Sequence, residues 1–156
     1  MKTKFVFLIN CLTLFVVGCS TASGPLFKEI PLGEHKGKAV VYFYRNGGKG
    51  SASTYNLRIS TGDTLPLENK GYLMFIVEPG EYKFAVSYHS KLLAENTFVF
   101  EGDRAYYIRY GTKVVARMLF IFDVYRKIAY FIDSVPKDDA LELLKECRLI
   151  EVPERP

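Results

Sequence analysis

The sequence predicts a mainly β protein, built as an antiparallel β-sandwich-like domain with one C-terminal α-helix. Three observations predict it. Apolar and polar side chains alternate with period two through much of residues 38–110, and turn-forming residues separate the alternating runs. A helical repeat of apolar residues then follows near the C-terminus.

Composition is typical of one domain with a mixed surface. The chain has 156 residues and a formal net charge of +4, and its basic residues are interspersed with acids. Such a distribution gives no basic stripe for nucleic acid, so we expect no nucleic-acid partner. A domain of this length buries enough surface to fold without a disulfide or metal, and we expect no cofactor.

The first 18 residues are typical of an export signal. Lys2 and Lys4 precede an apolar run over residues 5–17, and Gly18 supplies the small residue that a cleavage site needs. A transmembrane helix is the rival interpretation, but the run is about 13 residues and a span takes about 20. A plain secretory signal also fits the run, although it leaves the next residue, Cys19, unexplained.

Cys19, directly after Val16-Val17-Gly18, resembles the lipobox of bacterial lipoproteins. That resemblance implies cleavage before Cys19, a diacylglyceryl group on its sulfur and an acyl chain on its new amino group. Ser20 stands where an aspartate implies retention in the inner membrane, so the resemblance implies an outer-membrane lipoprotein facing the periplasm. We therefore expect a signal peptide over residues 1–18 and a membrane anchor at Cys19.

Residues 19–37 are predicted to form the lipidated N-terminus and a flexible tether, because Gly and Pro recur there without a sustained period. Four apolar residues are exceptions that could dock on the domain or on the membrane surface: Leu26, Phe27, Ile30 and Leu32. The folded domain is predicted over residues 38–151, with a frayed tail over residues 152–156.

Period-two alternation predicts strands over residues 54–60 and 82–89, with a further strand that places Phe98 and Phe100 on the inside face. Residues 39–44 and 72–77 are apolar on both faces, as central strands are. The predicted turns lie at residues 46–48, 61–63, 78–80 and 101–103.

Residues 113–133 fit both a helical stripe and strands. Their β-branched and aromatic residues favour two strands, with residues 123–127 turning between them. An amphipathic surface helix is the alternative that we keep. Charged residues within the stretch argue against a membrane span.

The last predicted element is a helix with Pro136 in its first turn. Ala140, Leu141, Leu144 and Cys147 recur at helical spacing, so this stripe is expected to cover the sheet and bury Cys147. With Cys11 in the signal and Cys19 lipidated, Cys147 has no cysteine to pair with inside the domain.

The order of these pieces resembles the bacterial lipoprotein family known as domain of unknown function 2846. The motifs that carry the resemblance are Val40-Val41-Tyr42-Phe43-Tyr44-Arg45, Val77-Glu78-Pro79-Gly80-Glu81-Tyr82, Tyr106-Tyr107-Ile108-Arg109, Ala140-Leu141 and Glu146-Cys147-Arg148-Leu149-Ile150. The resemblance implies a β-sandwich-like envelope domain and gives no catalytic residues.

Two sets of residues are candidate sites beyond Cys19. Tyrosines pair on one face of each of two strands, and if exposed they would form a binding surface for a glycan, a small apolar ligand or a partner: Tyr42, Tyr44, Tyr106 and Tyr110. Core packing is the favoured reading of these four. His89, near serines and Glu95, is the candidate for a hydrolase, the most distant alternative.

From these observations we expect a lipid-anchored, non-enzymatic interaction or accessory domain in the periplasm. Its partners are the membrane, through Cys19, and an envelope protein whose identity the sequence does not reveal.

Overall fold

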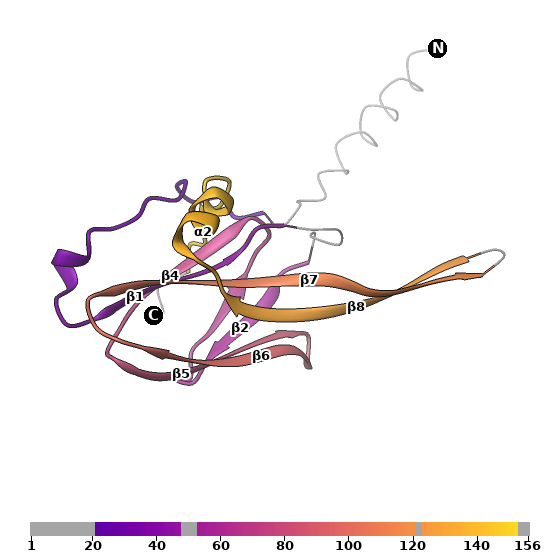
Figure 1. Cartoon of the computed structure of the whole chain (residues 1–156), viewed down its shortest axis with the longest axis horizontal. Helices are drawn as coiled ribbons and strands as arrows, with labels where there is room; N and C mark the ends of the chain where they lie inside the picture. Colours follow the sequence, from indigo (N-terminus) through magenta and orange to yellow (C-terminus); the bar gives the residue numbers. More distant parts are fainter. Residues whose placement is uncertain (1–20, 48–52, 121–122, 153–156) are drawn as a thin grey trace, which may run out of the picture.

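The computed structural model describes residues 21–47, 53–120 and 123–152, without the side chains of residues 116–126. Its strands are β1 (Ala39–Arg45), β2 (Tyr55–Ile59), β3 (Thr64–Leu67), β4 (Gly71–Val77), β5 (Gly80–Tyr88), β6 (Lys91–Phe100), β7 (Arg104–Phe120), β8 (Asp123–Ser134) and β9 (Arg148–Leu149). A 3-10 helix, η2 (Leu32–His35), precedes them, and helix α2 (Lys137–Leu144) follows β8. The predicted mainly β class with one short C-terminal helix is confirmed (Figure 1).

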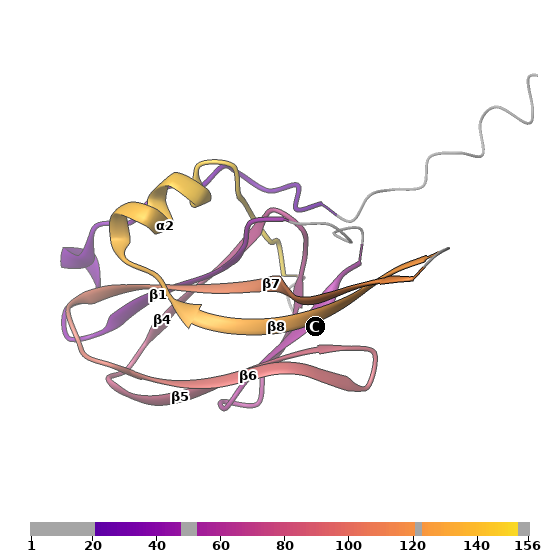
Figure 2. The same ribbon diagram turned by 45° about the vertical axis from the view of Figure 1, so that its right-hand side comes forward.

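The strands form two sheets that face each other (Figure 2). One has five strands in the order β8-β7-β1-β4-β9, and the other has four in the order β3-β2-β5-β6. Their facing side chains form the main core, in which Phe43 of β1 stacks on Phe84 of β5 with ring centroids 5.4 Å apart. The alternation predicted for β2 and β5 is confirmed, since Leu57 and Val86 are fully buried.

A second core lies on the other face of the five-stranded sheet. Helix α2 and the N-terminal segment cover this face and bury Tyr42, Tyr72, Tyr107 and Cys147 against Leu144. The domain therefore has three layers, with the five-stranded sheet in the middle. This explains why every residue of β1 is buried, because both of its faces are covered.

The predicted all-antiparallel pairing is wrong for the five-stranded sheet. Strand β1 pairs with β4 antiparallel but with β7 parallel, and β4 pairs with β9 parallel. The sheet is mixed because the chain leaves it after β4, forms β5 and β6 in the other sheet, and returns as β7 running alongside β1. The four-stranded sheet is antiparallel throughout.

Strand β4 was predicted to be buried on both faces, but Met74 and Ile76 are exposed on the outer face. Helix α2 is short and covers this face only near Tyr72, which belongs to the second core. The predicted turns at residues 61–63 and 101–103 lie between strands, whereas of the predicted turn at 78–80 only residues 78 and 79 do, because Gly80 begins β5. Residues 48 and 153–156, which include part of one predicted turn and most of the predicted tail, lie outside the described residues.

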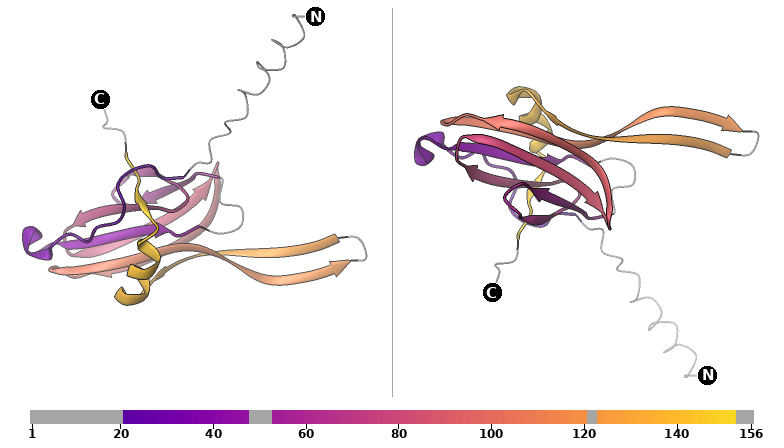
Figure 3. Two further views of the ribbon diagram at one scale, coloured as in Figure 1. Left: turned by 90° about the horizontal axis from the view of Figure 1, so that it is seen from above. Right: turned by 90° about the horizontal axis from the view of Figure 1, so that it is seen from below.

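The predicted strands over residues 113–133 are confirmed, and the helical alternative is wrong. The turn, however, does not lie at residues 123–127, because these residues belong to β8 and pair with β7. The two strands form one long hairpin that extends well beyond both sheets (Figure 3). Asp123 and its charged neighbours were the predicted turn, but the pairing of β7 with β8 continues until Phe120 lies opposite Asp123.

Candidate functional site

The N-terminal segment does not extend from the domain as the predicted flexible tether. Residues 21–37, called the strap below, lie against the helix-covered face. Thr21 forms a bridge with Asn69, and the Phe27 amide donates to the Cys147 carbonyl oxygen at 3.0 Å. The Ile30 amide donates to the hydroxyl of Tyr42 at 2.9 Å.

The apolar residues of the strap explain why it docks. Phe27 packs edge-on against the rings of Tyr42 and Tyr72, at centroid distances of 5.1 and 5.2 Å. Ile30 and Leu32 pack on the same core, whereas Leu26 is 54% exposed. The predicted docking of apolar strap residues on the domain is therefore confirmed for three of the four.

A polar clamp holds the middle of the strap. The Tyr107 hydroxyl donates to Glu29 Oε1 at 2.6 Å, and Lys137 Nζ of helix α2 reaches the same oxygen at 2.8 Å. The hydrogen bond from Lys137, followed by that from Tyr107, lowers the pKa of Glu29, while burial raises the pKa of Tyr107. Glu29 is thus held ionised and paired, which suits a structural clamp better than an acid or base that exchanges protons.

The C-terminal end of the strap is tied to the turn between β6 and β7. The Gly37 amide donates to Asp103 Oδ1 at 2.8 Å, and the Asp103 amide donates to the Lys38 carbonyl oxygen at 2.8 Å. Gly102 lies so close that a Cβ on it would overlap the Gly37 carbonyl oxygen. The strap is therefore fixed near its start, at its middle and at its end.

Between the clamp and this turn lies a hollow of about 310 Å³, lined in part by Leu32, Arg104 and Val135. The clamp residues that line it are already paired, Asp103 accepts from the Gly37 amide, and Arg104 forms an ion pair with Glu101 at 2.8 Å. The hollow is therefore a by-product of strap docking rather than a site with unpaired reactive groups.

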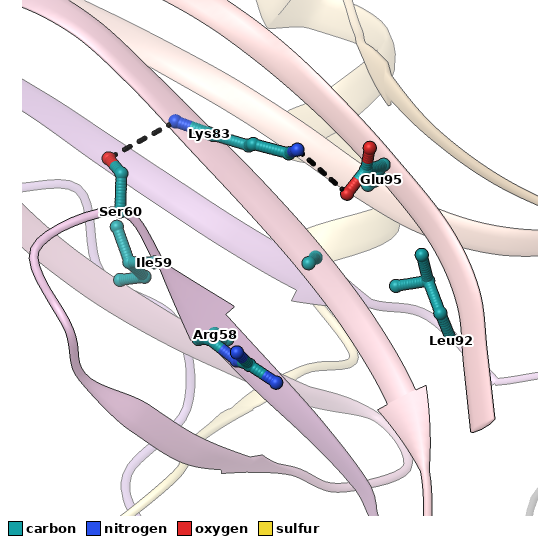
Figure 4. Close-up of a pocket in the computed structure, with 7 residues that line it drawn as sticks. Arg58, Ile59, Ser60, Lys83, Leu92 and Glu95 are labelled. Atoms are coloured by element: carbon teal, nitrogen blue, oxygen red, sulfur yellow. Dashed lines mark hydrogen bonds and ion pairs between the residues drawn. The ribbon is translucent and has the colours of Figure 1, made fainter. Parts of the chain in front are cut away.

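A second hollow, of about 320 Å³, lies on the outer face of the four-stranded sheet (Figure 4). Lys83 Nζ forms an ion pair with Glu95 at 3.0 Å across its floor, and Ser60 accepts a hydrogen bond from the Lys83 amide. Arg58 and Leu92 line the remainder. The ion pair satisfies both charges, and none of the described residues that line the groove is an aromatic that could stack on a sugar or a base.

The four candidate tyrosines do not form one surface. Tyr42 and Tyr44 are fully buried on the helix-covered face of the sheet, whereas Tyr106 and Tyr110 point into the core between the sheets. The prediction of an exposed tyrosine surface is therefore wrong. These residues pack in the two cores instead, as the favoured alternative expected. Burial raises the pKa of Tyr44 to about 12.

His89 lies at the turn between β5 and β6, with a φ of 51°. Its ring packs edge-on against the ring of Tyr88, with the two ring centroids 4.3 Å apart. Among the described residues, no hydrogen bond or ion pair joins His89 to a serine or a carboxylate, so the arrangement that a hydrolase would need is not assembled there. Nor does any group of three or more His, Cys, Asp or Glu in the described chain come close enough to bind a metal.

Cys147 is buried, as predicted, although it follows helix α2 rather than belonging to it. Its amide donates to the Leu144 carbonyl oxygen at 2.8 Å, and its Sγ contacts the Leu143 carbonyl oxygen at 3.6 Å. Burial raises the thiol pKa to about 12, with Glu146 adding to the shift.

The outer arms of the β7–β8 hairpin are the candidate site that sequence reasoning missed. Val114 and Ile128 pair across the two strands, and both are nearly half exposed, as is Val115. Lys113 and Lys127 are exposed beside them. The signal in the sequence was the lack of a Pro, Asn or Asp turn anywhere between residues 104 and 122.

Cys19 and the signal residues before it lie outside the described residues, so the lipobox stays a prediction. Among the described residues, no helix is both long and apolar enough to cross a bilayer. No protein-family model matches the chain, and no curated protein matches it either. The resemblance to domain of unknown function 2846 thus rests on the motifs quoted above.

Proposed function

We propose that the protein is a lipid-anchored protein of the cell envelope, held through Cys19 to the outer membrane and facing the periplasm. It acts as a non-enzymatic interaction or accessory domain. The observation that carries this proposal is the lipobox at residues 16–19, followed within two residues by a strap docked on the domain.

The strap sets how far the domain can stand from its anchor. Thr21 is bridged to Asn69, so only Ser20 separates Cys19 from the first fixed residue. Two residues of extended chain span at most about 7 Å. A lipobox implies three acyl chains, and two already give stable anchoring. Because the spacer between this anchor and the docked strap is so short, the domain would lie against the headgroups rather than float above them.

A role without catalysis is supported by the state of the polar groups in the two hollows. Glu29 is paired with Lys137 and Tyr107, and Lys83 is paired with Glu95. Catalytic sites more often hold groups whose protonation is poised to change at neutral pH. Two partly exposed ion pairs are ordinary surface features.

The alternatives from the sequence receive less support. A glycan or small apolar ligand would have to bind the groove around Lys83, because Tyr42, Tyr44 and Tyr110 are buried. Its described lining includes no aromatic side chain. A hydrolase would need His89 beside a nucleophile and an acid, and the described turn does not bring them together.

Cell fractionation of two cysteine variants tests the anchor. Cys19→Ala should leave an uncleaved precursor or a soluble protein, because the lipid has no sulfur to attach to. Cys11→Ala is the matched control, since it changes the other cysteine of the signal and should leave lipidation intact. A Cys19→Ala chain that is still cut before residue 19 and still fractionates with the outer membrane like the wild type would refute the proposal.

The sorting residue gives an independent test of localisation. Ser20→Asp should move the lipidated protein from the outer to the inner membrane, as the lipoprotein resemblance implies. Ser20→Ala is the control and should stay in the outer membrane. An unchanged distribution of the aspartate variant would count against the outer-membrane assignment while leaving the anchor itself intact.

A further inference from the structure

Strand β4 has one edge that is mostly unpaired. It pairs with β1 along its whole length, but on its other side β9 covers only Gly71 and Tyr72. In the part of the chain that the structure describes, no strand pair or backbone hydrogen bond reaches that side of residues 73–77. The chain after Ile150 does not continue the pairing, and Val152 is 42% exposed. Residues 73–77 are called the free edge below.

Two residues direct their backbone groups out of the free edge. The Arg148 amide donates to the Lys70 carbonyl oxygen, and the Ile150 amide donates to the Tyr72 carbonyl oxygen, both at 2.9 Å. Backbone groups of a strand point to alternate sides, so the N–H and C=O groups two and four residues after Tyr72 also point away from β1. These belong to Met74 and Ile76.

The free edge lacks the features that usually keep strand edges apart. Its sequence is Leu-Met-Phe-Ile-Val, with no charge and no proline, and its register with β1 has no bulge. By contrast, β3, an edge strand of the other sheet, has four residues and contains Pro66. The edge strands β6 and β8 are tied to each other, because the Asn96 side chain donates to the Ile132 carbonyl oxygen at 2.9 Å.

The free edge is complementary to an antiparallel copy of itself. A two-fold axis beside Phe75 sets Met74 of one copy opposite Ile76 of the other. Residues that lie directly opposite in an antiparallel pair can exchange both N–H···O bonds. This register therefore uses every backbone group that points out of the free edge, whereas a shift by two residues leaves some of them unpaired.

The ends of the free edge match the same register. Opposite Tyr72, where β9 lies on the edge, the second copy would place Glu78. The chain leaves the sheet at this point, because Pro79 and Gly80 lead into β5 of the other sheet. Two copies can therefore pair over residues 73–77 and separate where each would meet the other's β9.

The side chains on the outer face also fit this pairing. Met74 and Ile76 are 37% and 39% exposed, although both are large and apolar. In the two-fold register each Met74 lies beside an Ile76, and apolar side chains directly opposite each other stabilise a strand pair. The pairing thus covers the two most exposed side chains of β4.

We propose that the free edge of β4 pairs with the same edge of a second copy of this chain, so that the two five-stranded sheets join in a two-fold dimer. Such an interface uses one self-complementary patch on both subunits. The patch is small, so the dimer is reversible. This inference goes beyond the proposed function and needs no lipid on Cys19, so the two can fail separately.

Disulfide formation between two variants tests the register. Met74→Cys and Ile76→Cys chains are co-expressed at full length, purified together and oxidised. Opposite Cα atoms about 5.5 Å apart lie within reach of a disulfide. We expect a linked dimer from the mixture and much less from either variant alone, because identical positions then lie on the diagonal, about 7–8 Å apart. The wild-type chain gives the background from its own cysteines.

Val99→Cys, mixed with Met74→Cys, is the matched control, because Val99 is 67% exposed on β6. Equal yields of linked dimer from this mixture and from the test mixture would overturn the proposal. So would a disulfide between Ile76→Cys and Pro153→Cys within one chain, which would identify the C-terminal tail as the strand that covers the edge.

Charge variants test the dimer without a crosslink. In the variant Met74→Lys/Ile76→Lys, lysines would lie opposite lysines, and we expect about tenfold weaker association in sedimentation experiments on the full mature chain. Met74→Lys/Ile76→Glu is the matched variant and should restore association, because each lysine would then lie opposite a glutamate. Both keep charges at exposed positions, and circular dichroism checks that both fold. Equal association of the two variants, or a wild-type chain that sediments as a monomer at every concentration, would refute the dimer.

Discussion

Cys147 provides a sharp test of how the strap, helix and sheet pack together. It is fully buried, its carbonyl oxygen accepts from the Phe27 amide of the strap, and its amide donates to Leu144, the last residue of helix α2. Burial raises its thiol pKa to about 12. An unfolded thiol has a pKa of about 8.5, so at pH 8 about one quarter is thiolate. The native thiol would be ionised about one part in ten thousand at the same pH.

These fractions give the order of magnitude of the difference in reactivity that ionisation causes. The thiolate population falls about 2,500-fold on folding, but a thiolate of higher pKa is the better nucleophile by about 40-fold. Ionisation alone therefore slows labelling about 60-fold. Since the side chain is 0% exposed, the reagent must also wait for the strap or helix to open, which slows the reaction further.

The assay compares labelling of the mature protein at pH 8 in buffer and in denaturant, and mass spectrometry locates the label. We expect slow native labelling, fast labelling after unfolding, and loss of the signal in Cys147→Ser. Because a serine Oγ would lie farther from the Leu143 carbonyl oxygen than the Sγ does at 3.6 Å, the buried hydroxyl would lack a hydrogen-bond partner there, and this serine should cost about 1–3 kcal/mol. Native labelling within about tenfold of the unfolded rate would refute the packing described here.

Three further predictions concern the strap, its clamp and the buried thiol. Gly24→Ala should destabilise by about 1–3 kcal/mol and expose the strap to proteases, because the new Cβ would overlap a carbonyl oxygen of β9, while Gly33→Ala, which meets nothing within 4 Å, should not. Tyr107→Phe should cost about 1 kcal/mol and raise the pKa of Glu29, measured by NMR, because a hydrogen bond to the carboxylate is lost. Stability in urea should fall as pH rises from about 9 to 12, because the Cys147 thiol and buried tyrosines such as Tyr44 ionise in the unfolded chain before they do in the native one, and Cys147→Ala should lessen the fall without abolishing it.

Much of the fold could be predicted because its strands are amphipathic in the usual way. Leu57 and Ile59 alternate with Asn56 and Arg58, and burial follows that alternation. The apolar run of β1 predicted a strand covered on both faces, and every residue of β1 is buried. Parallel pairing could not be predicted, because it depends on where the chain re-enters the sheet after β6, and no local pattern records that.

The candidate site was harder to predict, because contacts between residues far apart in the chain decide it. The tyrosines at positions 42 and 106 look alike in sequence, but the two cores on opposite faces of one sheet divide them. The strap looked like a tether because Gly and Pro dominate it, while its docking comes from distant partners such as Tyr107 and Lys137. A turn signal at Asp123 concealed the length of the hairpin.

A lipid on Cys19, directly before the strap, is the feature on which the proposed function depends. The most direct test is the mass of the mature N-terminus, measured on protein purified from membranes. We expect a chain that begins at Cys19 and carries three acyl chains. An unmodified Cys19, or a chain cut elsewhere, would contradict it.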